Sequence, residues 1–239
     1  MIYFCHGVPG GPEDASLLGI EGVAAPDLFA AAPLAPFDAA TAGAPDGSVH
    51  LIRFSIGAMV ALRLAASRPD KVGKVTLISP TAPLNLGDFL PAMAGKPVFR
   101  MAKRLPSLLR FVTGLQGLVV KIAPDFMLDR LFAKAEPHER RLVSEPEVRK
   151  ALRAGLRNSM VNHPTAYVQA ISAYVGDWSG ALQMVTSPVE IWHGEADSWA
   201  PVVMSEALVQ NLTKGAQLRR IAGAGHYGAL KAARITPIT

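Results

Sequence analysis

The stretch His50-Leu-Ile-Arg-Phe-Ser55-Ile-Gly57-Ala58-Met-Val-Ala-Leu-Arg63 decides the expected fold. An apolar strand pattern ends at a serine, and a helix pattern rich in small residues begins directly after it. In such a strand–turn–helix, a tight turn exposes the serine hydroxyl above the sheet, while Gly57 and Ala58 let strand and helix approach closely. The helix N-terminus adds a backbone N–H and a partial positive charge that suit a developing oxyanion. The segment therefore predicts that Ser55 is a nucleophile.

Around this segment, short apolar runs alternate with helical patterns, which is typical of βαβ units and a mostly parallel sheet. We expect strands at residues 2–5, 23–25, 50–54, 74–79, 189–193 and 217–221, and helices at residues 56–66 and 201–212. Residues 83–177 differ, because they show helical periodicity and are far longer than an ordinary connection. The sequence therefore predicts an α/β core of residues 1–82 and 178–239, with a helical insertion of residues 83–177.

Two further segments supply partners for the serine. Gly194-Glu-Ala-Asp197 follows an expected strand, and His226 follows the last expected strand. Ligands of open α/β sheets bind beyond the carboxyl ends of the strands, and Ser55, Asp197 and His226 all follow such ends. We therefore expect these three side chains to meet, although they are far apart in the sequence.

Four motifs occur in order along the chain: His6-Gly-Val-Pro-Gly10 after the first strand, the elbow at Ser55, Ile191-Trp-His-Gly-Glu-Ala-Asp197, and Gly223-Ala-Gly-His226-Tyr227. Any one of them is weak evidence, but together, each in its strand context, they are specific. Over nearly its whole length, the chain resembles the α/β-hydrolase fold family. The order Ser, Asp, His is also the one that this family uses.

The resemblance implies a role for each residue of a catalytic triad. Ser55 would be the nucleophile, His226 the general base and acid, and Asp197 the group that orients the imidazole and stabilises its charged form. The backbone N–H groups of Val8 and Ile56 would form the oxyanion hole. The insertion would be a helical cap that shapes the substrate pocket.

Other side chains are candidates for the substrate pocket. Trp199 and Tyr227 flank the acid and the base, His6 lies in the oxyanion loop, and His163 comes from the insertion. The Met and Phe residues of the insertion either pack the helical lobe or line an apolar pocket. No His-x-x-x-His motif or carboxylate cluster is present, and the chemistry requires no cofactor, so we expect neither metal nor cofactor.

Two features depart from the family pattern. The elbow pattern is Gly-x-Ser-x-Gly, but Arg53 occupies its first position, so its side chain points away from the turn or the elbow is slightly opened. The family sheet begins with an antiparallel hairpin, whereas Met1 here starts the strand at residues 2–5, so the hairpin is missing or the start is truncated. We expect an exposed sheet edge, which invites a homo-oligomer.

Composition narrows the classes of function. The 239 residues are 50% hydrophobic and 18% charged, which argues against disorder, and a single cysteine, Cys5, excludes an internal disulfide. The net charge is +5, and residues 96–157 hold 14 basic but only 6 acidic residues. This basic excess is a solvated surface, or it meets an anionic substrate or an acidic membrane surface. Because nucleic-acid motifs, a membrane span and a signal peptide are all lacking, we expect a cytoplasmic protein that binds no nucleic acid.

The function expected from these observations is cleavage of a carboxylic ester through an acyl-enzyme, with an apolar acyl or aryl small molecule as substrate. The same triad also serves C–C bond hydrolysis, acyl transfer, perhydrolysis and lyase reactions. The fold includes non-catalytic small-molecule-binding proteins as well, because fold alone does not choose the function.

Overall fold

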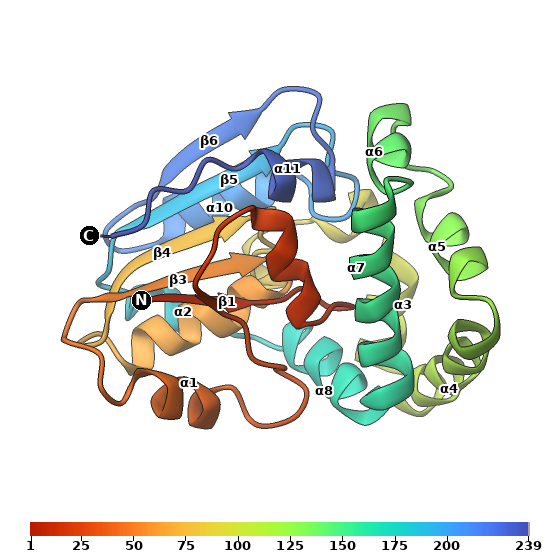
Figure 1. Ribbon diagram of the computed structural model, residues 1–239, viewed down its shortest axis with the longest axis horizontal. Helices are drawn as coiled ribbons and strands as arrows, with labels where there is room; N and C mark the ends of the chain where they lie inside the picture. Colours follow the sequence, from red (N-terminus) through yellow and green to blue (C-terminus); the bar gives the residue numbers. More distant parts are fainter. Residues whose placement is uncertain (239) are drawn as a thin grey trace.

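The computed structural model describes residues 1–238 and centres on one six-stranded sheet with the order β2-β1-β3-β4-β5-β6 (Figure 1). The strands are β1 (Ile2–Cys5), β2 (Val23–Ala24), β3 (Val49–Phe54), β4 (Val72–Ile78), β5 (Val189–Gly194) and β6 (Gln217–Ile221). Every pairing between them is parallel. The predicted α/β class is confirmed, and each expected strand is present, with β4 beginning two residues earlier than expected.

The strands differ in burial as their positions in the sheet require. Every residue of β3, at the centre, is buried, and its sequence is apolar except for His50 and Arg53. Central strands of parallel sheets are covered on both faces and therefore read as continuous apolar runs. The edge strand β6 carries Arg219 and Arg220, and both are exposed. Charged side chains on an edge strand oppose pairing with another chain.

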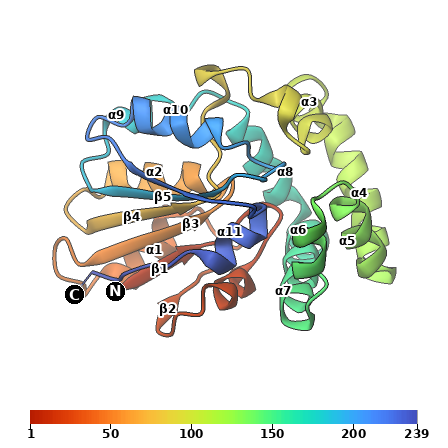
Figure 2. The same ribbon diagram turned by 90° about the horizontal axis from the view of Figure 1, so that it is seen from above.

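Helices cover both faces of this sheet. In Figure 2, α2 (Gly57–Ser67), α9 (Gly180–Gln183) and α10 (Val203–Asn211) lie on one face, and α11 (His226–Ala232) lies on the other. A 3-10 segment, η1 (Pro12–Leu18), packs against α11 on this second face. The helix α1 (Leu34–Thr41) is anchored by Phe37, whose ring contacts Tyr3 of β1 edge-on at 5.1 Å.

The long segment between β4 and β5 is helical, as predicted. It contains η2 (Leu84–Leu86), η3 (Leu90–Ala92), α3 (Lys96–Arg104), α4 (Pro106–Ile122), α5 (Pro124–Phe132), α6 (Pro137–Leu142), α7 (Pro146–Arg157), the π-helical η4 (Asn158–Asn162) and α8 (Pro164–Tyr174). Each helix from α3 to α8 has proline in its first turn. Proline favours that position because its fixed φ suits a helix and its missing N–H is not needed there.

These inserted helices, α3 to α8, lie beyond the carboxyl ends of the strands (Figures 1 and 2). The division into a core and a separate lobe at residues 83 and 177 stays a prediction. Within residues 1–238, no single helix is long and apolar enough to cross a membrane, although α4 and α5 together match such a span in length and composition across a bend of 118°.

The edge of the sheet beside β1 is formed by the very short strand β2 and not by a long exposed strand. β2 covers this side of β1, and only two pairs join them, Ile2 with Val23 and Tyr3 with Ala24. A strand this short leaves few unpaired backbone groups at the edge. Within residues 1–238 the sheet has no antiparallel hairpin. A homo-oligomer formed through this edge stays a prediction.

Candidate active site

The site is built around the backbone turn between β3 and α2. Ser55 occupies this turn with a φ of 59°, a left-handed conformation that is rare for residues other than glycine. Gly57 makes the turn possible, because a Cβ there would lie 2.8 Å from the carbonyl oxygen of His6. The turn therefore aims the Ser55 side chain away from the sheet at the start of α2, which is the geometry of a nucleophile elbow.

The structure brings Ser55, His226 and Asp197 into one hydrogen-bonded chain. The Nε2 atom of His226 lies 2.9 Å from the Ser55 hydroxyl oxygen, and its Nδ1 atom lies 2.7 Å from Oδ2 of Asp197. His226 begins α11, while Asp197 lies in the loop after β5. All three residues are buried. This arrangement can transfer the serine proton to the imidazole while the carboxylate holds the ring in place.

Asp197 is held by its own loop as well as by the histidine. Its Oδ1 atom accepts hydrogen bonds from the backbone N–H groups of Trp199 and Ala200, at 2.8 and 2.9 Å. Burial by itself raises the pKa of Asp197, but the nearby charge of His226 and these hydrogen bonds outweigh it. The pKa of Asp197 therefore lies below its usual value, and the group is ionised at neutral pH.

The loop that follows β1 passes very close to Ser55. A Cβ at Gly7 would lie 3.3 Å from the Ser55 Cβ, so only glycine lets this loop approach Ser55 without displacing it. Val8 and Ile56 both line a cavity of about 50 Å³ on one side of Ser55. Their position beside the serine is the one expected for residues whose N–H groups form an oxyanion hole.

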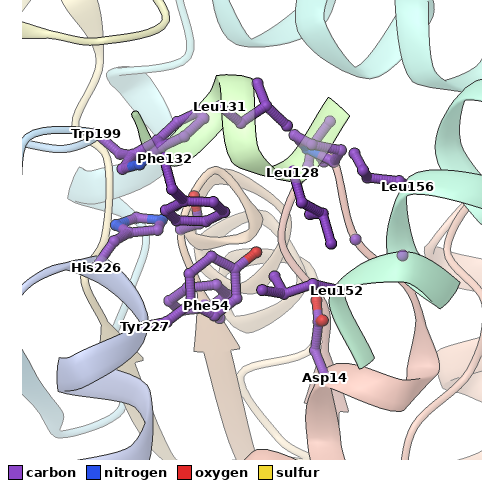
Figure 3. Close-up of a pocket in the computed structure, with 15 residues that line it drawn as sticks. Asp14, Phe54, Leu128, Leu131, Phe132, Leu152, Leu156, Trp199, His226 and Tyr227 are labelled. Atoms are coloured by element: carbon purple, nitrogen blue, oxygen red, sulfur yellow. The ribbon is translucent and has the colours of Figure 1, made fainter. Parts of the chain in front are cut away.

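A second small cavity, of about 30 Å³, is lined by both Ser55 and His226 (Figure 3). Its walls come from the inserted helices as well as from the sheet. Leu128 and Phe132 reach it from α5, and Leu152 and Leu156 reach it from α7. Because a water molecule alone needs a comparable volume, the inserted helices leave almost no free space above the serine.

The predicted pocket residues fall into two groups. Trp199 and Tyr227 line the 30 Å³ cavity, and Trp199 also lines the 50 Å³ cavity. His6 is fully buried and lines neither cavity beside Ser55; its Nε2 atom instead accepts the N–H of Leu28 at 3.1 Å. His163 is also absent from both cavities. The structure therefore does not bring these two histidines to the nucleophile.

The methionine and phenylalanine residues of the insertion divide between the two expected uses. Phe99 and Met93 line the 50 Å³ cavity, and Phe132 lines the 30 Å³ cavity. Others, such as Met127, are buried in the packing of the helices. Phe111 belongs to neither group, because 63% of it is exposed. Among residues 1–238, no group of three or more His, Cys, Asp or Glu side chains could hold a metal ion.

Arg53 takes the first of the two arrangements considered for it. Its side chain is fully buried and lies against α2, where its Nε donates a hydrogen bond to the carbonyl oxygen of Gly57. A Cβ at Gly57 would lie 3.1 Å from the guanidinium carbon, so the second glycine of the elbow also makes room for this arginine. The long side chain therefore leaves the tight turn at Ser55 intact.

Sequence reasoning missed Glu139 in α6, which holds the start of α11. Its carboxylate accepts hydrogen bonds from the N–H groups of Tyr227 and Gly228, at 2.6 and 3.0 Å. Burial raises the pKa of Glu139, although these N–H groups and His226 act in the opposite direction. Glu139 thus connects the inserted helices to the residue after the candidate base. Its motif, a glutamate within a short charged helix, contains no signal of this role.

Sequence reasoning also missed Asp14, which lies in η1 and lines the 30 Å³ cavity (Figure 3). Asp14 is 1% exposed, and neither of its carboxylate oxygens has a hydrogen-bond partner. Burial raises its pKa from 3.8 to about 6. An acidic residue is usually a surface residue, so only its position in the fold distinguishes Asp14.

Comparison with known proteins identifies the family of the chain. A family profile described as "alpha/beta hydrolase fold" matches residues 27–233. The chain therefore belongs to the α/β hydrolase family.

One individual relative shows a moderate similarity to the chain in sequence. The chain is 30% identical over 184 residues to the biotin biosynthesis bifunctional protein BioHC of Teredinibacter turnerae, a match that covers 75% of this chain and 30% of that protein. The chain thus spans less than a third of the length of this relative.

Solved structures resemble this chain in fold. A thermophilic esterase from Thermogutta terrifontis is 18% identical with a TM-score of 0.66, and the match covers 96% of this chain and 84% of the esterase. MenH from S. aureus is also 18% identical, with a TM-score of 0.62 and coverage of 97% and 88%.

Glu139 gives a first testable expectation. Replacing Glu139 by Ala leaves two buried N–H groups without acceptors, so we expect the free energy of unfolding to fall by about 2 kcal/mol. Glu139→Gln, which keeps one acceptor oxygen, should lose less. The matched control is Glu145→Ala, because exposed Glu145 also pairs with α11, through Lys231. That exposed pair should contribute at most about 1 kcal/mol, and urea unfolding that gave equal losses for both positions would contradict the assigned role of Glu139.

Asp14 gives a pH-dependent expectation. Its folded pKa lies above its unfolded value, so the fold loses stability as pH rises from about 4, and the loss is complete once pH has passed about 6. The shift corresponds to about 3 kcal/mol, which is absent below about pH 4, where the carboxyl is neutral in both states. Asp14→Asn should therefore be more stable than the native chain at pH 8 and lose this advantage by pH 4. The test is urea unfolding at both pH values, and an advantage independent of pH would contradict it.

Proposed function

We propose that this hydrolase cleaves carboxylic esters through a Ser55 acyl-enzyme, with His226 and Asp197 as the other members of the triad. The observation that carries the proposal is the continuous chain of hydrogen bonds from Ser55 through His226 to Asp197, with the serine in a left-handed turn. A serine hydroxyl is a weak nucleophile by itself, and an adjacent oriented base is what activates it.

The mechanism follows from the positions of these atoms. As the Ser55 oxygen attacks the ester carbonyl, Nε2 of His226 takes its proton, and the negative charge of Asp197 stabilises the imidazolium that forms. The N–H groups of Val8 and Ile56 then stabilise the oxyanion of the tetrahedral intermediate. His226 returns the proton to the alcohol that leaves. Water then attacks the acyl-enzyme while His226 takes its proton, and His226 returns this proton to Ser55 as the acid leaves.

The substrate class rests on the walls of the two cavities beside Ser55. Leu128, Phe132, Leu152 and Leu156 on one side, and Phe99 on the other, offer apolar contacts. We therefore assign an apolar acyl or aryl ester of small size. The esterase among the structural neighbours has the same fold, but at 18% identity it supports the fold alone.

The inserted helices act as a cap in this proposal, with boundaries at residues 83 and 177. The cavities of about 30 and 50 Å³ are too small for an ester substrate, so side chains of α5 and α7 must move when the substrate enters. Closure after entry would exclude water from the first step and strengthen the electrostatic interactions around the oxyanion.

The direct test is labelling with a fluorophosphonate, which reacts with an activated serine. The native chain should be labelled, and Ser55→Ala should not be labelled. Ser67→Ala, which removes an exposed hydroxyl at the end of the same helix α2, serves as the control and should react like the native chain. Labelling that persists in Ser55→Ala would exclude Ser55 as the nucleophile.

The cap proposal predicts a change in chain-length preference. Phe132 contacts Trp199 and Tyr227 with ring centroids 5.7 and 5.8 Å apart, so Phe132→Ala enlarges the cavity beside His226. The ratio of kcat/KM for p-nitrophenyl octanoate over acetate should then rise by about tenfold. Phe126→Ala is the matched control, because 59% of this phenylalanine on the same helix is exposed. An equal ratio in both variants would mean that Phe132 does not limit the pocket.

A further inference from the structure

The largest of the cavities described for this chain is not beside Ser55. A cavity of about 540 Å³ lies between α2, α8 and the loop at residues 28–34, and Ser55 does not line it. We call it the α2–α8 cavity. Its volume lies within the usual range of small-molecule sites, whereas the two cavities beside the serine are roughly a tenth of that size or less.

The lining of the α2–α8 cavity is apolar with a cationic component. Leu34, Val60 and Ala170 represent the apolar wall, which extends along α2 and α8. Two arginines, Arg53 and Arg63, line the same cavity, and no aspartate or glutamate does. The ligand that complements such a lining has an apolar body and a negative charge.

Arg53 is the unusual member of this wall. It is fully buried, and only its Nε has a partner, the carbonyl oxygen of Gly57. Its Nη1 and Nη2 atoms have no hydrogen-bond partner, and within residues 1–238 no carboxylate lies within ion-pair distance. The hydroxyl of Tyr3, a neighbour of Arg53, is also without a partner. A buried charge without a counter-ion is strongly unfavourable.

The elbow does not require this unfavourable buried charge. The first position of the elbow is glycine in the pattern of the family, and a glycine would place no charge beneath α2. Arg53 lines a large apolar cavity, and it carries a guanidinium whose two Nη atoms are buried without hydrogen-bond partners. Arginine is the side chain best suited to bind a carboxylate, because its donors match the two oxygens in a bidentate arrangement.

We propose that the α2–α8 cavity binds a monocarboxylate with an apolar tail, whose carboxylate pairs with Arg53 and whose tail packs along α2 and α8. The Nη atoms are almost completely covered in the empty cavity, so the guanidinium must rotate toward the ligand about its terminal bonds. Arg63, exposed at the same cavity, adds a second positive charge that attracts the anion.

The site is separate from the candidate active site but adjacent to it. Val8 and Ile56 line both the α2–α8 cavity and the 50 Å³ cavity beside Ser55. A ligand in the α2–α8 cavity would therefore lie behind the residues to which we assign the oxyanion hole. The inference does not depend on the proposed ester hydrolysis, because neither Ser55 nor His226 takes part in this binding.

The test is calorimetric titration of the full chain with decanoate and with decanol, which has the same tail but no charge. The native chain should bind decanoate at least about tenfold more tightly than decanol, because only the carboxylate pairs with Arg53. Arg53→Met should lower the affinity for decanoate by about tenfold or more and leave that for decanol nearly unchanged. Equal affinities of the native chain for both ligands, or unchanged decanoate binding in Arg53→Met, would overturn the proposal.

Two further variants locate the ligand. Ala170→Trp places a large side chain in the α2–α8 cavity from α8 and leaves the residue at position 53 unchanged, so it should weaken binding of both ligands even if Arg53→Met fails to fold. Phe126→Ala, which removes an exposed phenylalanine on α5, is the control and should leave decanoate affinity unchanged. If Ala170→Trp binds decanoate like the native chain, the ligand lies outside the α2–α8 cavity and the proposal is wrong.

Discussion

The left-handed backbone at Ser55 is the constraint on which the rest of the site depends. A φ of 59° at a residue with a side chain is unfavourable, so the surrounding structure must hold it. It is held by the buried strand β3 on one side and by α2 on the other, with Gly57 in contact distance of the His6 carbonyl. The same close packing brings the loop of His6 and Gly7 to Ser55. Strain at Ser55 and proximity of this loop are therefore two results of one packing arrangement.

The inserted helices take part in the site instead of only covering it. Glu139 in α6 holds the N–H groups at the start of α11, the helix that begins with His226. Phe132 in α5 packs on Trp199 and Tyr227, which follow the acid and the base. Movement of these helices would therefore change the support of the histidine as well as the size of the cavity. Under the proposed function, substrate entry and the positioning of His226 both depend on this segment.

Much of the fold could be predicted from local sequence patterns, because each of these patterns indicates one type of secondary structure. Apolar runs bounded by turns marked the strands, and proline at helix starts agrees with the helices of the insertion. The residues of the hydrogen-bonded chain were predictable because parallel strands share one carboxyl edge, so residues after β3, β5 and β6 come together. The positions of His6 and His163 were harder to predict. The residues around a loop histidine do not indicate whether its side chain faces a cavity or the core. The structure directs His6 toward Leu28 and leaves His163 outside both cavities.

The sequence by itself determined the α/β class, the position of the candidate residues directly after expected strands, and the identity of Ser55, Asp197 and His226 as candidates. It did so because these features depend on residues close together in the chain, or on the shared edge of a parallel sheet. Only the tertiary structure decided that Asp14, Glu139 and Arg53 are buried, since burial depends on what other segments place around a side chain. From sequence alone, a charged residue is expected at the surface. The free-energy cost of burying its charge depends on its hydrogen-bond and ion-pair partners, which only the tertiary structure shows.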